Sequence, residues 1–523
     1  MKTNTLFILF ITVFLASCRN EDLGNYDYHE IIEMTIDPLA DSYSVMMDIG
    51  ILEITPRVTL SDGSDPDNPR FEYFWITDKS LGRHDTIGRS RVLHWQAMLP
   101  IDAYDLRLRV FDRETGLLWK HETKLNVTSY HGRGILLIGE NGQGNVRVQL
   151  LGMIQGQDTV LYPDLFAYSD LPDLTGPIDV FHTGNSSTTM GDTRRIWLTT
   201  ASGSYWIDRY TLRSSINNTL NTYMPTPRVP PLGIVALAPR IKQANGDTGA
   251  NGQRFIITSD GNLYGCYIGI YGSLYEFPVN CLANDLFTYF PVAPYLFYSL
   301  NSMNGVVWYD TLDERFMLVS SALNAYSIAL VDNPADPFPW NQAGTGRTLV
   351  YGENTRDTEG SSPNGNSFAI MHSDLADSTY IYKFYANGNP PKKRACYPVI
   401  ASARAAGFDD ARFYAFASNR PVVFFVTADN HLYCYDYNPG SESVYPVDTG
   451  TSDPITMLKF DREMEPTSDF LYIATYNAAT AGGTLTKYAL NTMGQATLSP
   501  LPDYAKWAGQ LAKIVNMSWR GSE

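Results

Sequence analysis

Cysteine and histidine are both scarce in this chain. Its 523 residues include 5 cysteines and 8 histidines. Four of the cysteines, Cys266, Cys281, Cys396 and Cys434, show no CxxC or zinc-finger spacing, and no two histidines form an HExxH motif. The sequence therefore supports neither a zinc finger nor a metal-assisted hydrolase. Two states stay open for the cysteines: four buried thiols, which we favour, or a disulfide between Cys266 and Cys281 on adjacent strands.

The signature motifs of several enzyme classes are missing as well. The sequence contains no GxSxG nucleophile elbow, no glycine-rich phosphate loop and no dinucleotide-binding fingerprint. Paired carboxylates that act on glycosides leave no local pattern, because the two acids can come from distant parts of a fold. A glycoside hydrolase or lyase thus stays open, although the sequence names no catalytic residue.

The chain also has few positively charged residues relative to negatively charged ones, and it lacks long apolar runs behind Cys18. The chain has 39 lysines and arginines against 55 aspartates and glutamates, a net charge of −16, so nucleic acid is not an expected partner. Behind Cys18 no apolar run approaches the roughly 20 residues that cross a bilayer. With 44% hydrophobic residues, the chain can bury cores in two or more domains.

The first 18 residues have the layout of a lipoprotein export signal. Lys2 is followed by an apolar run at 6–15, and small Ala16 and Ser17 precede Cys18. This run is too short to span a membrane and is typical of a cleaved signal. We therefore predict a signal peptide at residues 1–17, a Cys18 lipidated with acyl chains such as palmitate, and a tether at residues 18–30.

Residues 31–130 are predicted to form a β-sandwich. Strands alternate at 71–76 and 104–110, a turn follows at 112–116, and another strand runs from 117 to 127. Several strands of this length with a tryptophan inside them are typical of an immunoglobulin-like domain of about 100 residues.

One loop of this domain offers oxygen ligands at close spacing. Asp62, Asp65 and Asp67 lie within seven residues, which makes them a weak calcium candidate. Because no later bidentate carboxylate is evident, a solvated acidic turn is the favoured interpretation. No other cofactor is predicted.

Residues 131–523 repeat. The segment 258–264 aligns without gaps to 427–433 and more loosely to 200–206, and each copy is an apolar strand, a tight turn and a second apolar strand. The spacings fit steps of about 56 residues, which suits a four-stranded propeller blade with loops. Stepping through the chain predicts seven hairpins, near 141–145, 200–206, 258–264, 313–314, 373–374, 427–433 and 482–483.

The C-terminal segment is predicted to close this ring. Residues 513–519 alternate like a strand, have no hairpin of their own, and resemble 454–460 at the start of another repeat. We expect this strand to complete the first blade and so remove exposed sheet edges. The predicted fold class is all-β, a sandwich followed by a seven-bladed propeller, with six or eight blades as alternatives.

Aromatic residues in proline-rich connections are the candidate ligand-binding residues. Tyr295 and Tyr298 lie near Pro294, and Phe338 and Trp340 flank Pro339. Rings held by prolines can stack on sugars or grip peptide side chains, although core packing is the alternative for each of them.

The residues behind Cys18 carry a family resemblance. Arg19-Asn20-Glu21-Asp22 resembles the acidic tag that directs lipoproteins of the Bacteroides phylum to the outer face of their outer membrane. Gly24-Asn25-Tyr26-Asp27-Tyr28 resembles the opening of PKD-like lipoproteins found beside SusC/SusD-type nutrient uptake systems. Together with the strands at 71–75 and 104–112 and the ending at 513–517, these residues make the chain similar to that family over most of its length.

The resemblance implies a location and partners. It implies a PKD-like first domain, a lipid anchor in the outer membrane facing the cell exterior, and a role as accessory to a TonB-dependent SusC/SusD-type transporter. It implies no catalytic residues. The leading hypothesis is a noncatalytic surface protein that binds a glycan or a peptide. The alternatives are a surface hydrolase or lyase with acids in the propeller funnel, and a structural subunit of the transporter complex.

Overall fold

The computed structural model describes residues 31–47, 50–79, 83–99, 101–129, 131–153, 159–166, 169–183, 186–187, 191–192, 195–209, 211–227, 229, 231–240, 252–267, 274–502 and 507–521. Cys18 and the predicted signal peptide and tether lie outside these residues. The chain divides into two compact units, 1–128 and 129–523, which are described separately below.

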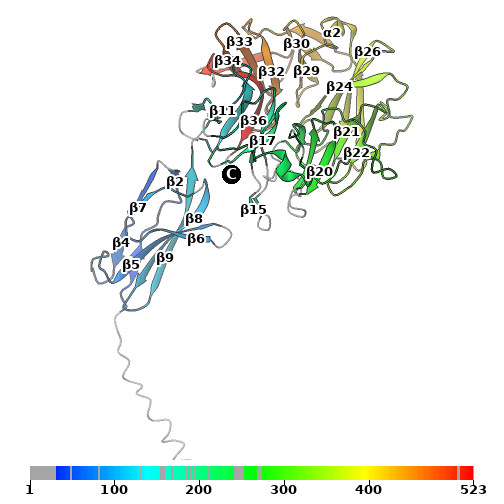
Figure 1. Ribbon diagram of the computed structural model, residues 1–523. Coiled ribbons are helices and arrows are strands. Elements are labelled where there is room, and N and C mark those ends of the chain that lie inside the picture. The colour runs from blue at the N-terminus through cyan, green and yellow to red at the C-terminus, as the bar shows by residue number, and fades with distance from the viewer. Residues whose placement is uncertain are drawn as a thin grey trace, which may run out of the picture. The chain divides into compact units, whose positions relative to one another are not determined.

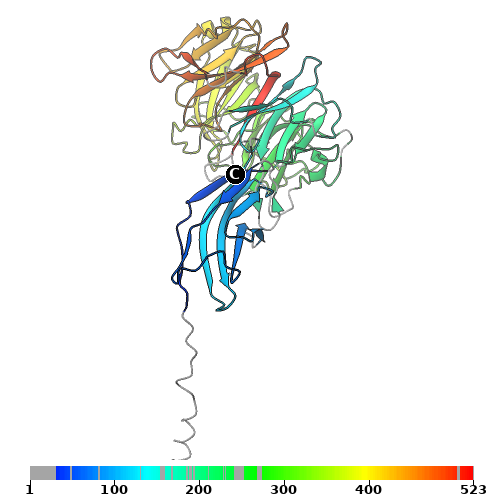
Figure 2. The same cartoon turned by 90° about the vertical axis from the view of Figure 1, so that its left-hand side faces the viewer.

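The first unit is a β-sandwich. One sheet has five strands in the order β2-β9-β8-β5-β6, in which β2 runs parallel to β9, and β1-β4 and β3-β7 form two-stranded sheets. Trp75 is fully buried in a core to which both the large sheet and the short pairs contribute. The long strands are visible in Figure 2. The strands are β1 Met34–Ile36, β2 Ser42–Met46, β3 Ile51–Ile54, β4 Val58–Leu60, β5 Phe71–Lys79, β6 Arg83–Gly88, β7 Leu93–Gln96, β8 Asp102–Asp112 and β9 Leu118–Thr128.

The second unit is a β-propeller, and Figure 1 shows its sheets following one another around a ring. The first three blades within the described residues are β12-β11-β10-β36, β13-β16-β17 and β18-β19-β20. Their strands are β10 Gly134–Glu140, β11 Val146–Gly152, β12 Val160–Tyr162, β36 Lys513–Arg520, β13 Pro177–Thr183, β16 Arg195–Thr200, β17 Gly203–Ile207, β18 Ile234–Ala238, β19 Gln253–Thr258 and β20 Leu263–Tyr267.

Four further blades complete the ring in the described part of the chain. The fourth is β21-β22-β23, extended inward by bridges from Val292 and Phe297 to β21. The others are β24-β25-β26-β27, β28-β29-β30-β31 and β32-β33-β34-β35. Their strands are β21 Val306–Asp310, β22 Arg315–Val319, β23 Ile328–Ala329, β24 Arg347–Asn354, β25 Ser367–Ser373, β26 Ser378–Tyr385, β27 Lys392–Pro398, β28 Phe413–Phe416, β29 Val422–Val426, β30 Leu432–Asp436, β31 Ser443–Pro446, β32 Ile455–Phe460, β33 Phe470–Asn477, β34 Gly482–Leu490 and β35 Leu498–Leu501.

Three short elements complete the description. They are the hairpin β14 Ser186–Ser187 and β15 Gly191–Asp192, the 3-10 turn η1 Leu220–Tyr223 and the helix α2 Ala401–Ala405. The predicted fold class, an all-β sandwich followed by a propeller, is confirmed, and the seven predicted hairpins are pairs of adjacent antiparallel strands. No helix in the described residues is long and apolar enough to cross a membrane.

Each blade buries both of its faces. In β25, Phe368 and Ile370 pack toward the sixth blade, whereas Ala369 and Met371 pack toward the fourth. Seven clusters of buried residues in the described chain join successive blades in this way, and the last joins the seventh blade to the first. Because side chains alternate across a strand, a blade strand can be apolar along its whole length.

The repeated turn has a common construction. The Thr258 hydroxyl donates to Asp260 and the Thr427 hydroxyl to Asp429, each over 2.5 Å. The next residue is Gly261 at φ 79° in one copy and Asn430 at φ 72° in the other. Glycine and asparagine are the residues that tolerate this left-handed conformation best, which explains the Asp-Gly and Asp-Asn pairs of the repeat.

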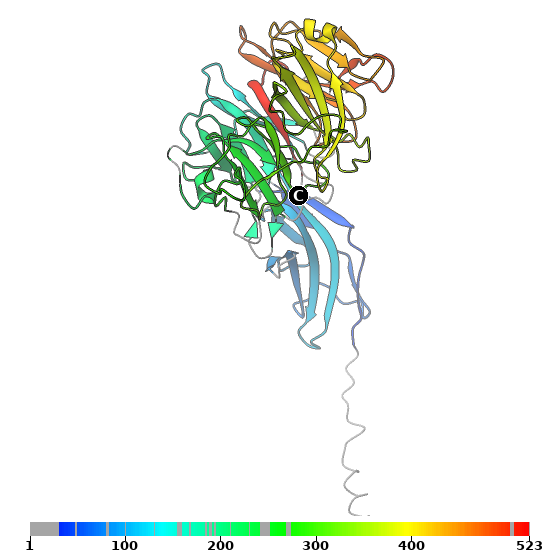
Figure 3. The same cartoon turned by 90° about the vertical axis from the view of Figure 1, so that its right-hand side faces the viewer.

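The C-terminal strand closes the ring. β36 pairs antiparallel with β10 and so becomes the innermost strand of the first blade, as predicted. Figures 2 and 3 show this red strand beside the cyan strands of residues 134–152. The amide of Ala512 also donates to the Gln149 side chain over 2.8 Å, which fastens the start of β36 to β11.

The four described cysteines are free, and Cys266, Cys281 and Cys434 are buried. The disulfide considered for Cys266 and Cys281 is therefore not formed. Burial raises the pKa of the Cys266 thiol to about 12, although Arg254 and Tyr275 act in the opposite direction. Such a thiol is unreactive at neutral pH.

The closure makes a testable prediction at Gly139, where β10 meets β36. A Cβ at this position would overlap the Lys513 carbonyl oxygen and lie 2.7 Å from its carbonyl carbon. We expect Gly139→Ala to lower the free energy of unfolding by about 2–4 kcal/mol, because a backbone atom cannot move aside cheaply. Urea unfolding followed by tryptophan fluorescence measures this change.

Gly142 in the same hairpin is the matched control. The nearest atom to a Cβ there is 3.8 Å away, so Gly142→Ala should change stability by less than about 0.5 kcal/mol. Equal effects of the two substitutions would contradict the close approach of β36 to β10.

Candidate functional site

A cavity of about 450 Å³ lies among the innermost strands of the propeller. Residues of β13, β18, β24, β28, β32 and β36 line it, together with the segment 294–300 of the fourth blade. All seven blades therefore contribute to its wall. A volume of this size is within the range of small-molecule binding sites.

Irregular pairing recurs in the strands that line the cavity. The registers of β13, β18, β24 and β32 each skip one residue, namely Ile178, Val235, Val350 and Thr456. In β36, Val515 is skipped in the same way. A β-bulge changes which face the following side chains occupy, and bulges are common beside functional sites.

The cavity wall contains many charged side chains. Four basic and three acidic side chains line it: Arg240, Arg412, Lys459, Arg462, Asp179, Glu353 and Glu463. The chain as a whole has a net charge of −16. The cavity is thus a place where basic side chains outnumber acidic ones in an acidic protein.

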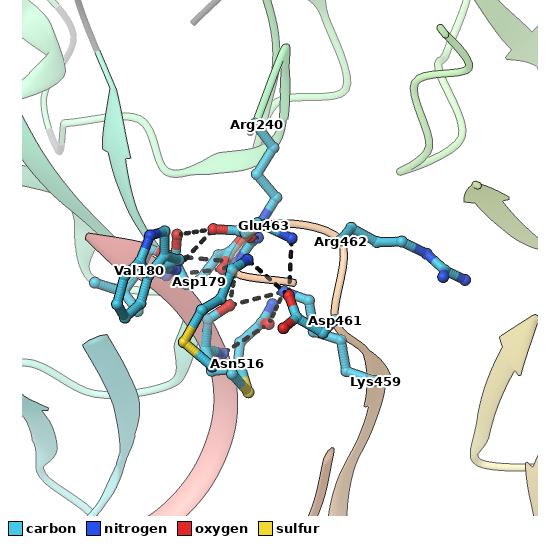
Figure 4. Close-up of polar contacts among 12 residues, drawn as sticks. Asp179, Val180, Arg240, Lys459, Asp461, Arg462, Glu463 and Asn516 are labelled. Atoms are coloured by element: carbon cyan, nitrogen blue, oxygen red, sulfur yellow. Dashed lines mark hydrogen bonds and ion pairs between the residues drawn. The ribbon is translucent and has the colours of Figure 1, made fainter. Parts of the chain in front are cut away.

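Arg240 joins several blades through its guanidinium group. Two of its nitrogens donate to the Asp179 carboxylate, each over 2.8 Å, and a third pairs with Glu463 (Figure 4). It also donates to the Met517 carbonyl of β36 over 2.5 Å. Burial alone would lower the pKa of Arg240, but the charges of Asp179 and Glu463 outweigh it and hold that pKa above its usual value.

Glu463 is in turn held by the closing strand. Its second carboxylate oxygen accepts the Ser518 hydroxyl over 2.8 Å and the Trp519 amide over 2.7 Å. Both oxygens are therefore engaged, one by a cation and one by two donors. This carboxylate connects the end of β32 to β36.

Glu353 and Arg462 form a second polar group. The Arg462 guanidinium lies 3.6 Å from Glu353 and 3.4 Å from Asp469, and Figure 4 shows it pointing away from the Arg240 cluster. The Phe416 amide donates to Glu353 over 2.9 Å and the Tyr351 hydroxyl over 3.3 Å. Burial raises the pKa of Glu353, although Arg462 opposes this shift.

Lys459 differs from these cations. Its ammonium group donates to the Asn516 side-chain oxygen over 3.1 Å and to the Met517 carbonyl over 2.7 Å (Figure 4). No carboxylate in the described residues comes within 4 Å of it to form an ion pair. Burial, reinforced by the neighbouring Arg240 charge, lowers the pKa of Lys459 to about 8. Lys459 is therefore a cation without a paired charge in the cavity wall.

The four predicted aromatic residues separate into two pairs. Tyr295 and Tyr298 line the cavity, and Tyr295 is half-buried there. The Tyr298 hydroxyl accepts the Arg240 amide over 2.9 Å, and burial raises its pKa to about 12. Sequence reasoning thus found two residues of the cavity wall.

Phe338 and Trp340 lie in the core between the fourth and fifth blades, with exposed fractions of 2% and 3%. Phe338 stacks on Tyr382 at 4.1 Å between ring centroids, and Trp340 meets Phe384 edge to face at 5.2 Å. The protein itself covers these rings, which leaves them no free face for a ligand in this structure. Here the packing alternative holds.

The acidic turn of the first unit is held by internal contacts. Both Asp67 oxygens accept from Arg91 over 2.8 Å, while Asp62 accepts the Ser64 amide and Asp65 the Asp67 amide over 2.9 Å. Among the described residues, no group of three or more histidine, cysteine, aspartate or glutamate side chains is placed to hold a metal ion. Asp67 is thus committed to an arginine, and the calcium candidate at this turn stays a prediction.

A known protein family matches the N-terminal part of the chain, which includes the β-sandwich of the first unit. Residues 19–171 match the PKD-like family, which is less than a third of the chain. No curated protein matches the sequence. The chain is thus an all-β protein with a PKD-like region and a propeller built around a polar cavity.

Solved propeller structures resemble the chain only distantly. The similarity to a quinonprotein alcohol dehydrogenase-like protein from Bacteroides thetaiotaomicron covers 92% of this chain and 97% of the other chain, at 10% identity and a TM-score of 0.37. The similarity to the dihydro-heme d1 dehydrogenase NirN covers 88% of this chain and 76% of the NirN chain, at 9% identity and a TM-score of 0.38. The similarity to the Cps50 (Swd1) propeller domain of Myceliophteria thermophila covers 63% of this chain and 88% of that domain's chain, at 12% identity and a TM-score of 0.34. No activity is inferred from these similarities.

Removing a paired cation and removing an unpaired one should change the free energy of unfolding in opposite directions. Replacing Arg240 with methionine leaves Asp179 and Glu463 buried without their cation, so we expect the free energy of unfolding to fall by about 3–5 kcal/mol. Lys513→Met is the control, because this lysine is 45% exposed and 3.3 Å from Glu140, and an exposed pair contributes less than about 1 kcal/mol. Chemical denaturation of both variants measures the difference, and a similar small loss in both would refute the role given to Arg240.

Lys459→Met should act in the opposite direction. Since its charge is unpaired, removing it should raise the free energy of unfolding at pH 7 by roughly 1–2 kcal/mol, less than the pKa shift implies because two carbonyl oxygens lose a donor. In the wild type the native pKa of about 8 lies below the ordinary value of 10.5, so the unfolded chain binds more protons between them and stability increases with pH in this window. The stability of wild type minus variant, measured from pH 7 to 9.5, should therefore rise with pH. A flat difference would mean that Lys459 titrates normally.

Proposed function

We propose that this protein is a lipid-anchored, noncatalytic binding protein of the cell surface, in which the central propeller cavity holds the ligand. The observation that carries the proposal is the cavity itself, a space of about 450 Å³ to which all seven blades contribute polar and aromatic side chains. Concave sites with a few convergent polar groups are the usual form of small-molecule sites.

The state of the carboxylates favours binding over hydrolysis. A glycosidase needs one carboxyl group that donates a proton and a second that acts as base or nucleophile. Here Asp179 and Glu463 are both paired with Arg240, and Glu353 accepts two hydrogen bonds beside Arg462. Neither arrangement leaves a free acid and base pair among the described lining residues.

The location and partners rest on the sequence. The export signal that ends at Cys18 and the match to the PKD-like family from residue 19 support a lipoprotein of the outer membrane facing the exterior. The resemblance to lipoproteins of SusC/SusD-type systems supports a role as accessory to a TonB-dependent transporter, to which the protein would supply captured glycan or peptide.

The proposal is tested by a screen of residues 19–523 against glycans and peptides, with affinity and product release read in the same samples. Val515 lines the cavity, so Val515→Trp should fill it and weaken binding by about tenfold or more. The exposed Val331, which is 87% accessible, is the matched control, and Val331→Trp should bind as the wild type does. Binding that Val515→Trp abolishes, without products, supports the proposal.

Other outcomes would replace it. Products would identify a hydrolase or lyase, and binding that is unaffected by Val515→Trp would place the site elsewhere. Neither binding nor products with any ligand of the panel would point to a structural role in a transporter complex.

A further inference from the structure

We propose that the central cavity binds a carboxylate-bearing sugar, with Lys459 receiving the carboxylate and Tyr295 offering its ring to the sugar. This inference rests on the proposed function, because it takes the cavity to be the ligand site, and it adds the chemical class of the ligand and the residue that selects it.

The charge balance of the wall is the first support. Of the four basic side chains, Arg240 is paired with Asp179 and Glu463, and Arg462 lies beside Glu353 and Asp469. Lys459 and the exposed Arg412 have no carboxylate partner among the described residues. A cation that faces a cavity without a counter-ion is costly unless a ligand supplies the negative charge.

The geometry of Lys459 is the second support. An ammonium group has three donors, and the side-chain oxygen of Asn516 and the backbone carbonyl of Met517 take two of them. One donor remains, on a group that lines the cavity and is partly accessible. A single compact donor suits one oxygen of a carboxylate, whereas phosphate and sulfate sites are usually built from arginine forks or several backbone amides.

Groups around Lys459 explain why its charge is available to a ligand. Arg240 from the end of β18 opposes the charge, while Asp179 of β13 and Glu463 and Asp461 behind β32 favour it from beyond ion-pair distance. Glu353 of β24 also interacts with it at longer range. Asp179 and Glu463 are committed to Arg240, and both oxygens of Asp461 accept backbone amides of residues 463–465. A bound carboxylate would be the nearest counter-ion of Lys459.

The rest of the wall favours a sugar over a peptide. The half-buried Tyr295 ring is fixed edge-on against Tyr351 at 5.6 Å between centroids, and its hydroxyl donates to the Val350 carbonyl over 3.2 Å. A rigid aromatic ring in a wall that also holds the Asn516 side-chain amide matches a ligand with one apolar face and many hydroxyl groups. An extended peptide is instead recognised along a groove or a free strand edge, which a cavity of about 450 Å³ ringed by seven blades does not offer.

The test uses residues 19–523 and pairs of ligands that differ in one charge. Tri-galacturonate, a hyaluronan tetrasaccharide and sialyllactose are each titrated by calorimetry beside their methyl esters, together with tri-glutamate. We expect at least one acid sugar to bind about tenfold or more tightly than its ester, because the ester cannot pair with Lys459. Lys459→Met should abolish this preference while keeping a folded and more stable protein, and Lys459→Arg should retain part of it.

Lys392→Met is the control for net charge. Lys392 is exposed on β27, the strand of the fifth blade farthest from the cavity-lining β24, so this variant should keep the wild-type preference. The affinity for the acid should fall as pH rises through about 8, where Lys459 loses its proton, whereas the affinity for the ester should not.

The outcomes separate the two proposals. Equal binding of acid and ester, or a preference that survives Lys459→Met, overturns the role of Lys459 but leaves the cavity as the site if Val515→Trp still blocks binding. Preference for tri-glutamate overturns the assignment to sugars. Failure of every carboxylated sugar in the panel overturns this inference, and the proposed function then stands or falls on the neutral glycans and peptides of the wider screen.

Discussion

The propeller depends on one constraint: every blade is apolar on both faces and must be covered on both. Buried clusters join each described blade to the next, and the circle closes only because β36 completes the first blade. Without that strand, β10 would present a free edge next to an uncovered seventh blade, which is the situation that exposes a sheet to aggregation. The close approach at Gly139 and the amide bond from Ala512 to Gln149 are the local means by which this strand is held.

The same closure creates the site. Innermost strands converge on an axis, and five of those described have a bulge directly beside lining residues such as Asp179 and Asn516. Charges in such a place are stable only when they are paired and hydrogen-bonded. Arg240 meets this requirement for Asp179 and Glu463, and through Glu463 and Met517 it also attaches β36 to the rest of the ring. The closing strand and the polar cluster therefore depend on one another.

Lys459 is the exception, because it is a partly buried cation with no carboxylate partner among the described residues. A protein that needed only stability could place an apolar residue there, because the loss of two hydrogen bonds to β36 would cost less than the unpaired charge does. Residues that lower stability often serve binding, because a site that is preorganised for a charged ligand already holds the opposite charge before the ligand arrives. The cavity wall thus combines one group of charges that supports the fold with Lys459, a partly buried charge that is available for recognition.

The sequence predicted the fold better than the site. Repeat arithmetic found the hairpins because the turn chemistry of Thr258 to Gly261 and Thr427 to Asn430 is local and leaves a visible pattern. It could not find Arg240, Asp179 and Glu463, which lie far apart in the chain and meet only when the ring closes. Tyr295 and Tyr298 were found through their proline context, but the same context selected Phe338 and Trp340, because nothing in a sequence tells which side of a loop faces the core.

The role of Lys459 as a cation that pairs with a ligand can be measured through its own titration. In protein labelled with 15N- and 13C-lysine, with the resonance of Lys459 assigned through Lys459→Arg, we predict a pKa of about 8 in the free protein and a higher pKa once a carboxylated ligand is bound. A pKa near the ordinary 10.5 in the free protein, unchanged by any ligand that the cavity binds, would rule out this role of Lys459.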